Sequence, residues 1–165
     1  MSLLRFIAAL LLLAATPVTA PAAERPNDAM ALKGVTTGKV IWDISMANAE
    51  TLAVYLSVVR ETYDDLVRQN VTPQMVLAVH GAPVRYVTRS TDDLPLDIMA
   101  AVDKVNAILD DLAGRPGVRV EVCAVANRLF GIENATIRPN FHVVGNTWVS
   151  LIGYQAQGYA LVPVN

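Results

Sequence analysis

Beyond residue 38, short apolar runs alternate with longer segments in which apolar residues recur every three or four positions. The short runs predict β-strands and the recurring segments predict amphipathic helices. The predicted strands span 39–44, 74–79, 118–123, 141–144 and 159–162. Two long helices are predicted between Asn48 and Asn70 and over 98–112, and two shorter ones over 124–130 and 147–157.

The order of these elements predicts an α/β fold. Strands that alternate with helices form a mostly parallel sheet with helices on both faces, linked by right-handed crossovers. The run 74–79 is nearly all apolar, which is typical of a strand covered on both faces. The chain has 165 residues, enough for one domain. We therefore predict a single three-layer domain with a five-stranded sheet over residues 38–165.

The N-terminus has the layout of a secretory signal peptide. Arg5 precedes the uninterrupted apolar run 6–15, and small residues and prolines follow as far as Ala23. The run is shorter than the roughly 20 residues that span a bilayer. We therefore expect removal of residues 1–23, export to the periplasm, and no stable membrane anchor. Residues 24–37 have no clear period and are expected to form a flexible lead-in.

Charge and composition limit the classes of partner. Removal of Arg5 with the signal peptide changes the net charge from −2 to about −3, and no basic stripe is present to neutralise phosphates. Nucleic acid is therefore not an expected partner. The apolar fraction of 53% favours burial of some surface between copies of the chain. With one cysteine, no intramolecular disulfide holds the fold.

Several chemistries lack the residues that they need. The two histidines and the cysteine have no metal-ligand spacing, and neither glycine-rich nucleotide motif occurs. A serine elbow and a pair of cysteines for a dithiol cycle are also missing from the sequence. No cofactor and no metal are therefore predicted. His142 lies inside an apolar run, and we expect it to pack in the core or an interface.

Cys123 lies where the strand 118–123 meets the short helix 124–130. A thiol at the start of a helix faces unpaired backbone N–H groups and the positive end of the helix dipole, which favour the thiolate. Free cysteines are also among the most often buried residues and pack as small hydrophobes. Cys123 is thus a candidate reactive residue, with a structural role as the alternative.

Other candidates share a position at the carboxyl ends of strands, where ligands bind in open α/β sheets. They are Asp43, His80 and Gly145, together with Cys123. His80 and Cys123 are candidates for a thiol–imidazole pair, in which the imidazole lowers the pKa of the thiol or moves its proton. Alternatively, His80 is a loop histidine bonded to backbone, and Asp43 caps the turn that follows it.

Several short stretches together carry a family resemblance. They are 39–44, Thr62-Tyr63, 79–83, 118–123 with Asn127 and Gly131, and 155–160 before Pro163. In this order and spacing they resemble the DsrE/DsrF-like family, in particular its exported single-domain members.

The resemblance implies a homo-oligomer, a trimer or a hexamer, and a link to sulfur metabolism. In sulfur-relay members a cysteine carries a persulfide to a partner, and that role falls here on Cys123. His80 matches a family position without an assigned role. The sequence thus favours an exported carrier of sulfane sulfur, with a donor or acceptor protein as partner, over a turnover enzyme. A non-catalytic oligomeric binding or assembly module, or a thiol oxidant sensor, remains open.

Overall fold

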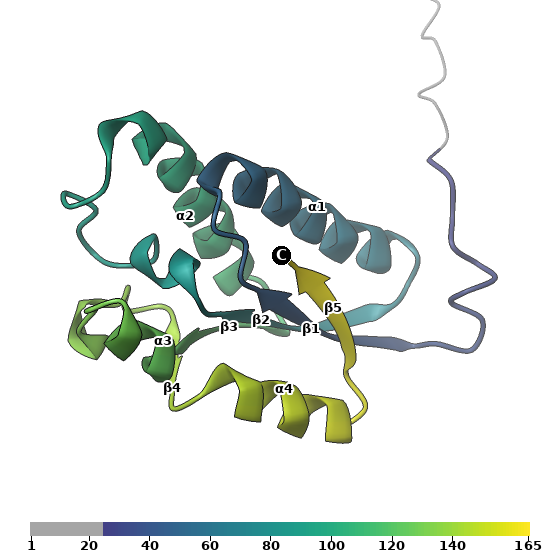
Figure 1. Cartoon of the computed structure of the whole chain (residues 1–165). Helices are drawn as coiled ribbons and strands as arrows, with labels where there is room; N and C mark the ends of the chain where they lie inside the picture. Colours follow the sequence, from purple (N-terminus) through teal and green to yellow (C-terminus); the bar gives the residue numbers. More distant parts are fainter. Residues whose placement is uncertain (1–24) are drawn as a thin grey trace, which may run out of the picture.

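The computed structural model describes residues 25–165 (Figure 1). Its strands are β1 (Thr37–Ile44), β2 (Thr72–Val79), β3 (Val118–Cys123), β4 (His142–Val144) and β5 (Ala160–Val164). Its α-helices are α1 (Ala49–Arg68), α2 (Met99–Ala113), α3 (Ala124–Leu129) and α4 (Thr147–Ala156). Three 3₁₀ turns are η1 (Ala82–Arg85), η2 (Leu96–Ile98) and η3 (Asn134–Thr136).

The predicted signal peptide, residues 1–23, lies outside the described residues. Within 25–165, no helix has both the length and the apolar character needed to cross a membrane. Residues 25–36 run beside α1, where the Asp28 backbone N–H donates to Gln69 Oε1 at 2.6 Å.

The five strands form one sheet in the order β4-β3-β2-β1-β5, and every pair is parallel. The chain moves in one direction from β1 to β4 and then crosses back to β5. The crossover from β4 to β5 runs opposite to those from β1 to β2 and from β2 to β3, and right-handed crossovers in opposite directions place their helices on opposite faces. Figure 1 accordingly shows α1 and α2 on one side of the sheet and α4 on the other, and it shows the short helix α3 on the side of α4 as well. The predicted α/β fold with helices on both faces is confirmed.

Local signals in the sequence account for most element boundaries. Asn48 caps α1 by accepting a hydrogen bond from the Thr51 N–H at 2.8 Å. Asn70 ends the helical segment in a left-handed conformation with φ of 61°. The last strand extends beyond its predicted end, through Pro163 to Val164. Proline is tolerated there because β5 is an edge strand with no neighbour beyond it.

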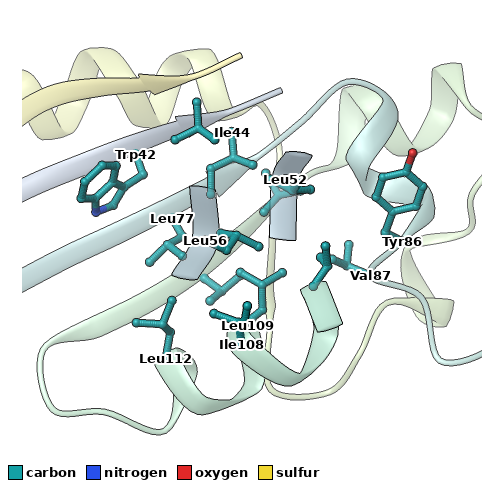
Figure 2. Packing of buried hydrophobic residues seen from close by; sticks show 14 of the residues in the cluster. Trp42, Ile44, Leu52, Leu56, Leu77, Tyr86, Val87, Ile108, Leu109 and Leu112 are labelled. Carbon is teal, nitrogen blue, oxygen red and sulfur yellow. The ribbon is translucent and has the colours of Figure 1, made fainter. Parts of the chain in front are cut away.

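One face of the sheet is covered by α1 and α2 and forms the main core (Figure 2). Alternate residues of the three central strands point into it, namely Val40, Trp42, Ile44, Met75, Leu77, Val79, Val120 and Val122. The buried stripe of α1 matches the predicted one and includes Leu52, Leu56, Val59 and Tyr63. We call this side of the sheet the packed face.

The opposite side, which we call the α4 face, has a much smaller apolar cluster. Ile41, Val76 and Ala78 pack there against Leu151 of α4. Strand side chains alternate between faces, so the register of β3 with β2 also places Glu121 on this side. Of the two helices on this side, the ten-residue α4 packs on the cluster, and Glu121 of β3 lies beside it.

A tight turn after α2 depends on a glycine. Gly114 is the C-cap residue of α2 and keeps a right-handed conformation with φ of −80°, so the turn's left-handed residue lies further along the chain. Gly117 adopts φ of 76°, and a Cβ there would overlap the carbonyl oxygen of Pro73. The close approach of this turn to β2 therefore requires glycine just before β3 begins.

His142 was predicted to pack in the core or in an interface; the structure places it outside the core, and its place in an interface stays a prediction. It lies on β4, the short edge strand of the sheet, and is exposed in the single chain. The apolar run 141–144 was the basis of the prediction, but of its four residues only Phe141 is buried.

Candidate functional site

Cys123 is the last residue of β3 and directly precedes α3, as the sequence predicts. Its register with Val144 of β4 and its spacing from Glu121 put its side chain on the α4 face. Only 4% of the residue is exposed, and it is a free thiol. This buried position is compatible with both alternatives for Cys123, a reactive thiol and a structural residue.

Burial alone raises the pKa of the Cys123 thiol, because it disfavours the charged thiolate. N–H and hydroxyl donors around the sulfur outweigh this effect, and the pKa of the thiol is lowered from its ordinary value. The donors, in order of their effect, are the Thr147 N–H, the Ala126 N–H, the Thr147 hydroxyl and the Val125 N–H. Donors from two different helices therefore stabilise the thiolate.

The contribution of Thr147 was missed from sequence, since this residue lies 24 positions beyond the cysteine in the chain. Asn146 caps α4 by accepting from the Trp148 N–H at 3.0 Å, which fixes the first turn of that helix beside β3. Thr147 is fully buried, and its hydroxyl makes no hydrogen bond of ordinary geometry among residues 25–165. The role that the structure leaves for the Thr147 hydroxyl is therefore to stabilise the sulfur of Cys123.

The site lies where the connections of neighbouring strands diverge. The chain leaves β2 for α2 on one side of the sheet and leaves β3 for α3 on the other (Figure 1). Such a divergence opens a crevice at the carboxyl ends of parallel strands, the usual place for a ligand. The predicted candidates at the ends of β2 and β3 therefore meet at one crevice.

A pocket of about 260 Å³ occupies this crevice. It is lined by His80, Gly81, Cys123, Val125, Ala126, Leu129, Phe130, Asn146, Thr147 and Trp148. The apolar walls come from α3 and the start of α4, and the polar groups come from the strand ends. Ligand pockets are typically larger, at about 300–1,000 Å³, so this one suits a small group.

His80 is held firmly at the rim of the pocket. Its backbone N–H donates to the Ile44 carbonyl at 3.0 Å, which extends the β1–β2 ladder by one residue. Gly81 follows with φ of 64° and ψ of −148°, a region open essentially to glycine alone. The imidazole packs edge-on against Trp148, with ring centroids 6.5 Å apart and planes at 79°.

The imidazole is paired with a carboxylate. His80 Nε2 lies 2.6 Å from Asp43 Oδ1, and both side chains are mostly buried. The ring therefore bonds a side chain, whereas the alternative from sequence was a bond to backbone. His80 and Cys123 line the same pocket, but no hydrogen bond joins them among the described residues. The structure thus brings Asp43, His80 and Cys123 to one place, with the histidine bound to Asp43.

A second polar cluster on the α4 face was not predicted. Glu121 is buried, and its Oε1 accepts from Arg119 Nε at 2.8 Å and from the Tyr154 hydroxyl at 3.0 Å. Its Oε2 has no hydrogen-bond partner within residues 25–165. Burial, followed by the charge of Glu121, raises the pKa of Tyr154. The alternation Val-Arg-Val-Glu-Val in β3 is the sequence signal from which Arg119 and Glu121 could have been predicted to lie on one face.

The arrangement is suited to thiol chemistry. The sulfur has donors that favour its anion, and His80, which is paired with Asp43, lines the same pocket. In the part of the chain that the structure describes, no group of three or more His, Cys, Asp or Glu side chains is placed to hold a metal ion.

Comparisons with known proteins add information on the fold. No family model matches the sequence. A protein of Aquifex aeolicus (strain VF5), described as uncharacterized, is 22% identical over 125 residues, which cover 76% of this chain and 55% of that protein. The chain thus spans about half the length of this curated relative.

A solved structure supports the architecture. It is that of a protein of unknown function from Methanobacterium thermoautotrophicum, with a TM-score of 0.61 and 17% sequence identity. The match covers 77% of this chain and 99% of the other. The fold and the site together define a three-layer α/β protein with a crevice at the strand ends. The comparison with the solved structure supports the fold alone.

Proposed function

We propose that the protein carries sulfane sulfur as a persulfide on Cys123. The observation that supports this most is a free thiol that lies buried in a small pocket, at the junction of a strand and a helix and beside the first turn of α4. Burial raises the pKa of such a thiol, but the N–H groups of Thr147, Ala126 and Val125 and the Thr147 hydroxyl lower it and so favour a sulfur anion. A persulfide is a sulfur anion one atom longer, and the pocket has room for that atom.

Loading would require only a nucleophilic thiolate and a donor with an outer sulfur atom. With thiosulfate, the thiolate attacks the outer sulfur, the sulfur–sulfur bond breaks, and sulfite leaves with the electron pair of that bond. With polysulfide, the leaving group is the shortened polysulfide. Neither reaction needs a cofactor, and both leave Cys123 as a persulfide anion.

The rest of the proposal rests on the sequence. The resemblance to exported DsrE/DsrF-like proteins suggests sulfur metabolism in the periplasm, with a protein as the sulfur donor or acceptor. The signal-peptide layout of residues 1–23 supports export.

We also propose that the chain forms a homo-oligomer through the outer side of α4. Trp148, Val149 and Ile152 are exposed there, and α4 contains no charged residue. Two such surfaces can face each other without burying an unpaired charge. Leu129 and Phe130 of the pocket wall are also exposed, so the apolar surface continues to the rim of the pocket.

Intact-mass measurement of the purified protein tests the proposed carrier role. After incubation with polysulfide or thiosulfate and removal of excess donor, we expect an addition of about 32 Da, one sulfur atom. Cys123→Ser is the matched control and should gain nothing. Lack of the addition in the wild type, or an addition that persists in Cys123→Ser, would remove the proposal.

One observation favours a second candidate, a binding or assembly module in which Cys123 is structural. The residue is only 4% exposed. This alternative predicts very slow labelling by a small thiol reagent in the native state and rapid labelling in denaturant. A native labelling rate within about tenfold of the unfolded rate would exclude it, because exposure and ionisation govern the reactivity of cysteines.

A further inference from the structure

The hydrogen bond of the His80 imidazole goes to Asp43 and not to Cys123. The groups that lower the pKa of the thiol are N–H groups and the Thr147 hydroxyl, and His80 makes no hydrogen bond to the sulfur among the described residues. The imidazole nevertheless lines the pocket that contains the thiol. The imidazole is therefore available to accept or donate a proton of another group that enters this pocket.

The hydrogen bond to Asp43 determines which nitrogen is available. An ionised carboxylate only accepts hydrogen bonds, so the His80 nitrogen at 2.6 Å, Nε2, must carry a hydrogen. In the neutral ring Nδ1 is then unprotonated and basic. The edge-on contact with Trp148 and the backbone bond to Ile44 restrict rotation and displacement of the ring.

On the basis of the proposed carrier function, we propose that His80 moves a proton from an acceptor thiol to the outer sulfur of the Cys123 persulfide. Asp43 is the positioning residue that fixes the tautomer and orientation of His80. The inference concerns the release of sulfur, a step distinct from its loading.

The step balances without an oxidant or reductant. His80 Nδ1 takes the proton of the acceptor thiol and passes it to the outer sulfur, which makes that sulfur electrophilic. The acceptor thiolate attacks it, a new sulfur–sulfur bond forms, and the bond to Cys123 breaks. Cys123 leaves as the thiolate that its hydrogen bonds stabilise, and the acceptor becomes a persulfide.

The pocket lining also indicates the class of acceptor. Apart from His80 and Cys123 it contains no ionisable side chain, and Val125, Leu129 and Trp148 supply apolar walls. No Lys or Arg side chain of this lining is present to pair with a carboxylate or phosphate of the acceptor. An uncharged thiol should therefore be accepted, and 2-mercaptoethanol is a suitable probe.

The test separates loading from release. Wild type, His80→Ala, Asp43→Asn and the control His142→Ala are loaded with polysulfide, and loss of about 32 Da on addition of 2-mercaptoethanol is followed by intact mass. We expect equal loading in all four proteins. Release should slow by about 100-fold in His80→Ala, the scale of one general acid–base group. It should slow by about 10-fold in Asp43→Asn, in which the tautomer is no longer fixed.

Added imidazole should partly restore release in His80→Ala and leave the control His142→Ala unchanged. A variant that is merely distorted would not respond to imidazole. Release from His80→Ala at the wild-type rate, or slow release that imidazole does not restore, would overturn the role of His80. Release from Asp43→Asn at the wild-type rate would overturn the role of Asp43.

If His80→Ala does not fold, His80→Gln replaces it and should show the same slow release. If the wild type itself does not load, the carrier proposal fails, and this result is distinguishable from each of the others.

Discussion

The two faces of the sheet use the same strands but differ in what covers them. On the packed face, α1 and α2 bury a continuous apolar core between themselves and three strands (Figure 2). On the α4 face, one uncharged helix packs on a small cluster around Ile41 and Leu151. The packed face contains the bulk of the apolar contacts that stabilise the domain.

Every candidate for chemistry lies on the second face or at its rim. Asp43, Glu121 and Cys123 point to this face by strand alternation, and His80 follows the end of β2. A thinly covered face leaves a crevice where polar side chains can meet a ligand. The main apolar core and the candidates for chemistry therefore lie on different sides of one sheet.

Truncation of a core residue on the packed face should have the largest effect. Leu56 of α1 is fully buried, and Leu56→Ala should lower the free energy of unfolding by about 2–5 kcal/mol through lost burial and a residual cavity. Ile152 of α4 is 70% exposed and provides the comparison. The loss in Leu56→Ala should not depend on protein concentration, whereas any loss in Ile152→Ala should, because it would act through association. Denaturant unfolding at two protein concentrations measures both, and a concentration-independent loss of equal size in Ile152→Ala would contradict this difference between the two faces.

A polar contact on the α4 face should have the next largest effect. Tyr154→Phe removes a hydrogen bond to the buried carboxylate of Glu121 and should cost about 1.5–3 kcal/mol at neutral pH. The raised pKa of Tyr154 means that the folded state holds this proton more tightly. The wild type should therefore lose stability as the pH rises above about 10, and the difference from Tyr154→Phe should shrink there.

Tyr159→Phe is the control for that measurement, because the Tyr159 hydroxyl makes only a long bond of 3.4 Å to Gln74. Equal losses in the two variants at neutral pH would contradict the prediction, as would a difference between Tyr154→Phe and wild type that persists above pH 10.

The two helix caps provide the smallest and most selective comparison. Asn48 caps α1 and Asn146 caps α4, each through its side chain. Either substitution by Ala should cost about 1 kcal/mol. Only Asn146→Ala should also slow alkylation of Cys123 at neutral pH, because it loosens the turn that presents Thr147 to the sulfur. Equal alkylation rates in the two variants would show that the cap of α4 does not support the thiol.

The sequence predicted the fold in detail because each element has its own local signal. Apolar periodicity located α1 and α2, and β3 was predicted with its observed limits. The thiol at the junction of β3 and α3 was placed by the same local pattern. The exposure of His142 in the single chain was not predicted, since an apolar run does not reveal that its strand lies at the edge of the sheet.

The site was predictable only in part, because its interactions join distant segments. Thr147 reaches Cys123 only because β4 lies next to β3 and α4 starts where β4 ends. The pairing of Asp43 with His80 depends on the neighbouring position of β1 and β2. Strand order was not derivable from the sequence, so neither interaction could be assigned from it.

The ionisation of Cys123 in the folded protein tests the central claim most directly. The rate of alkylation by iodoacetamide, measured against pH in the native state, gives the pKa of the thiol. We expect a lower midpoint in the native state than for the same thiol in denaturant, and a higher native midpoint in Thr147→Val, which lacks the hydroxyl donor. A native midpoint at or above that of the unfolded protein would show that burial outweighs the donors, and would contradict the assignment of Cys123 as a thiolate site.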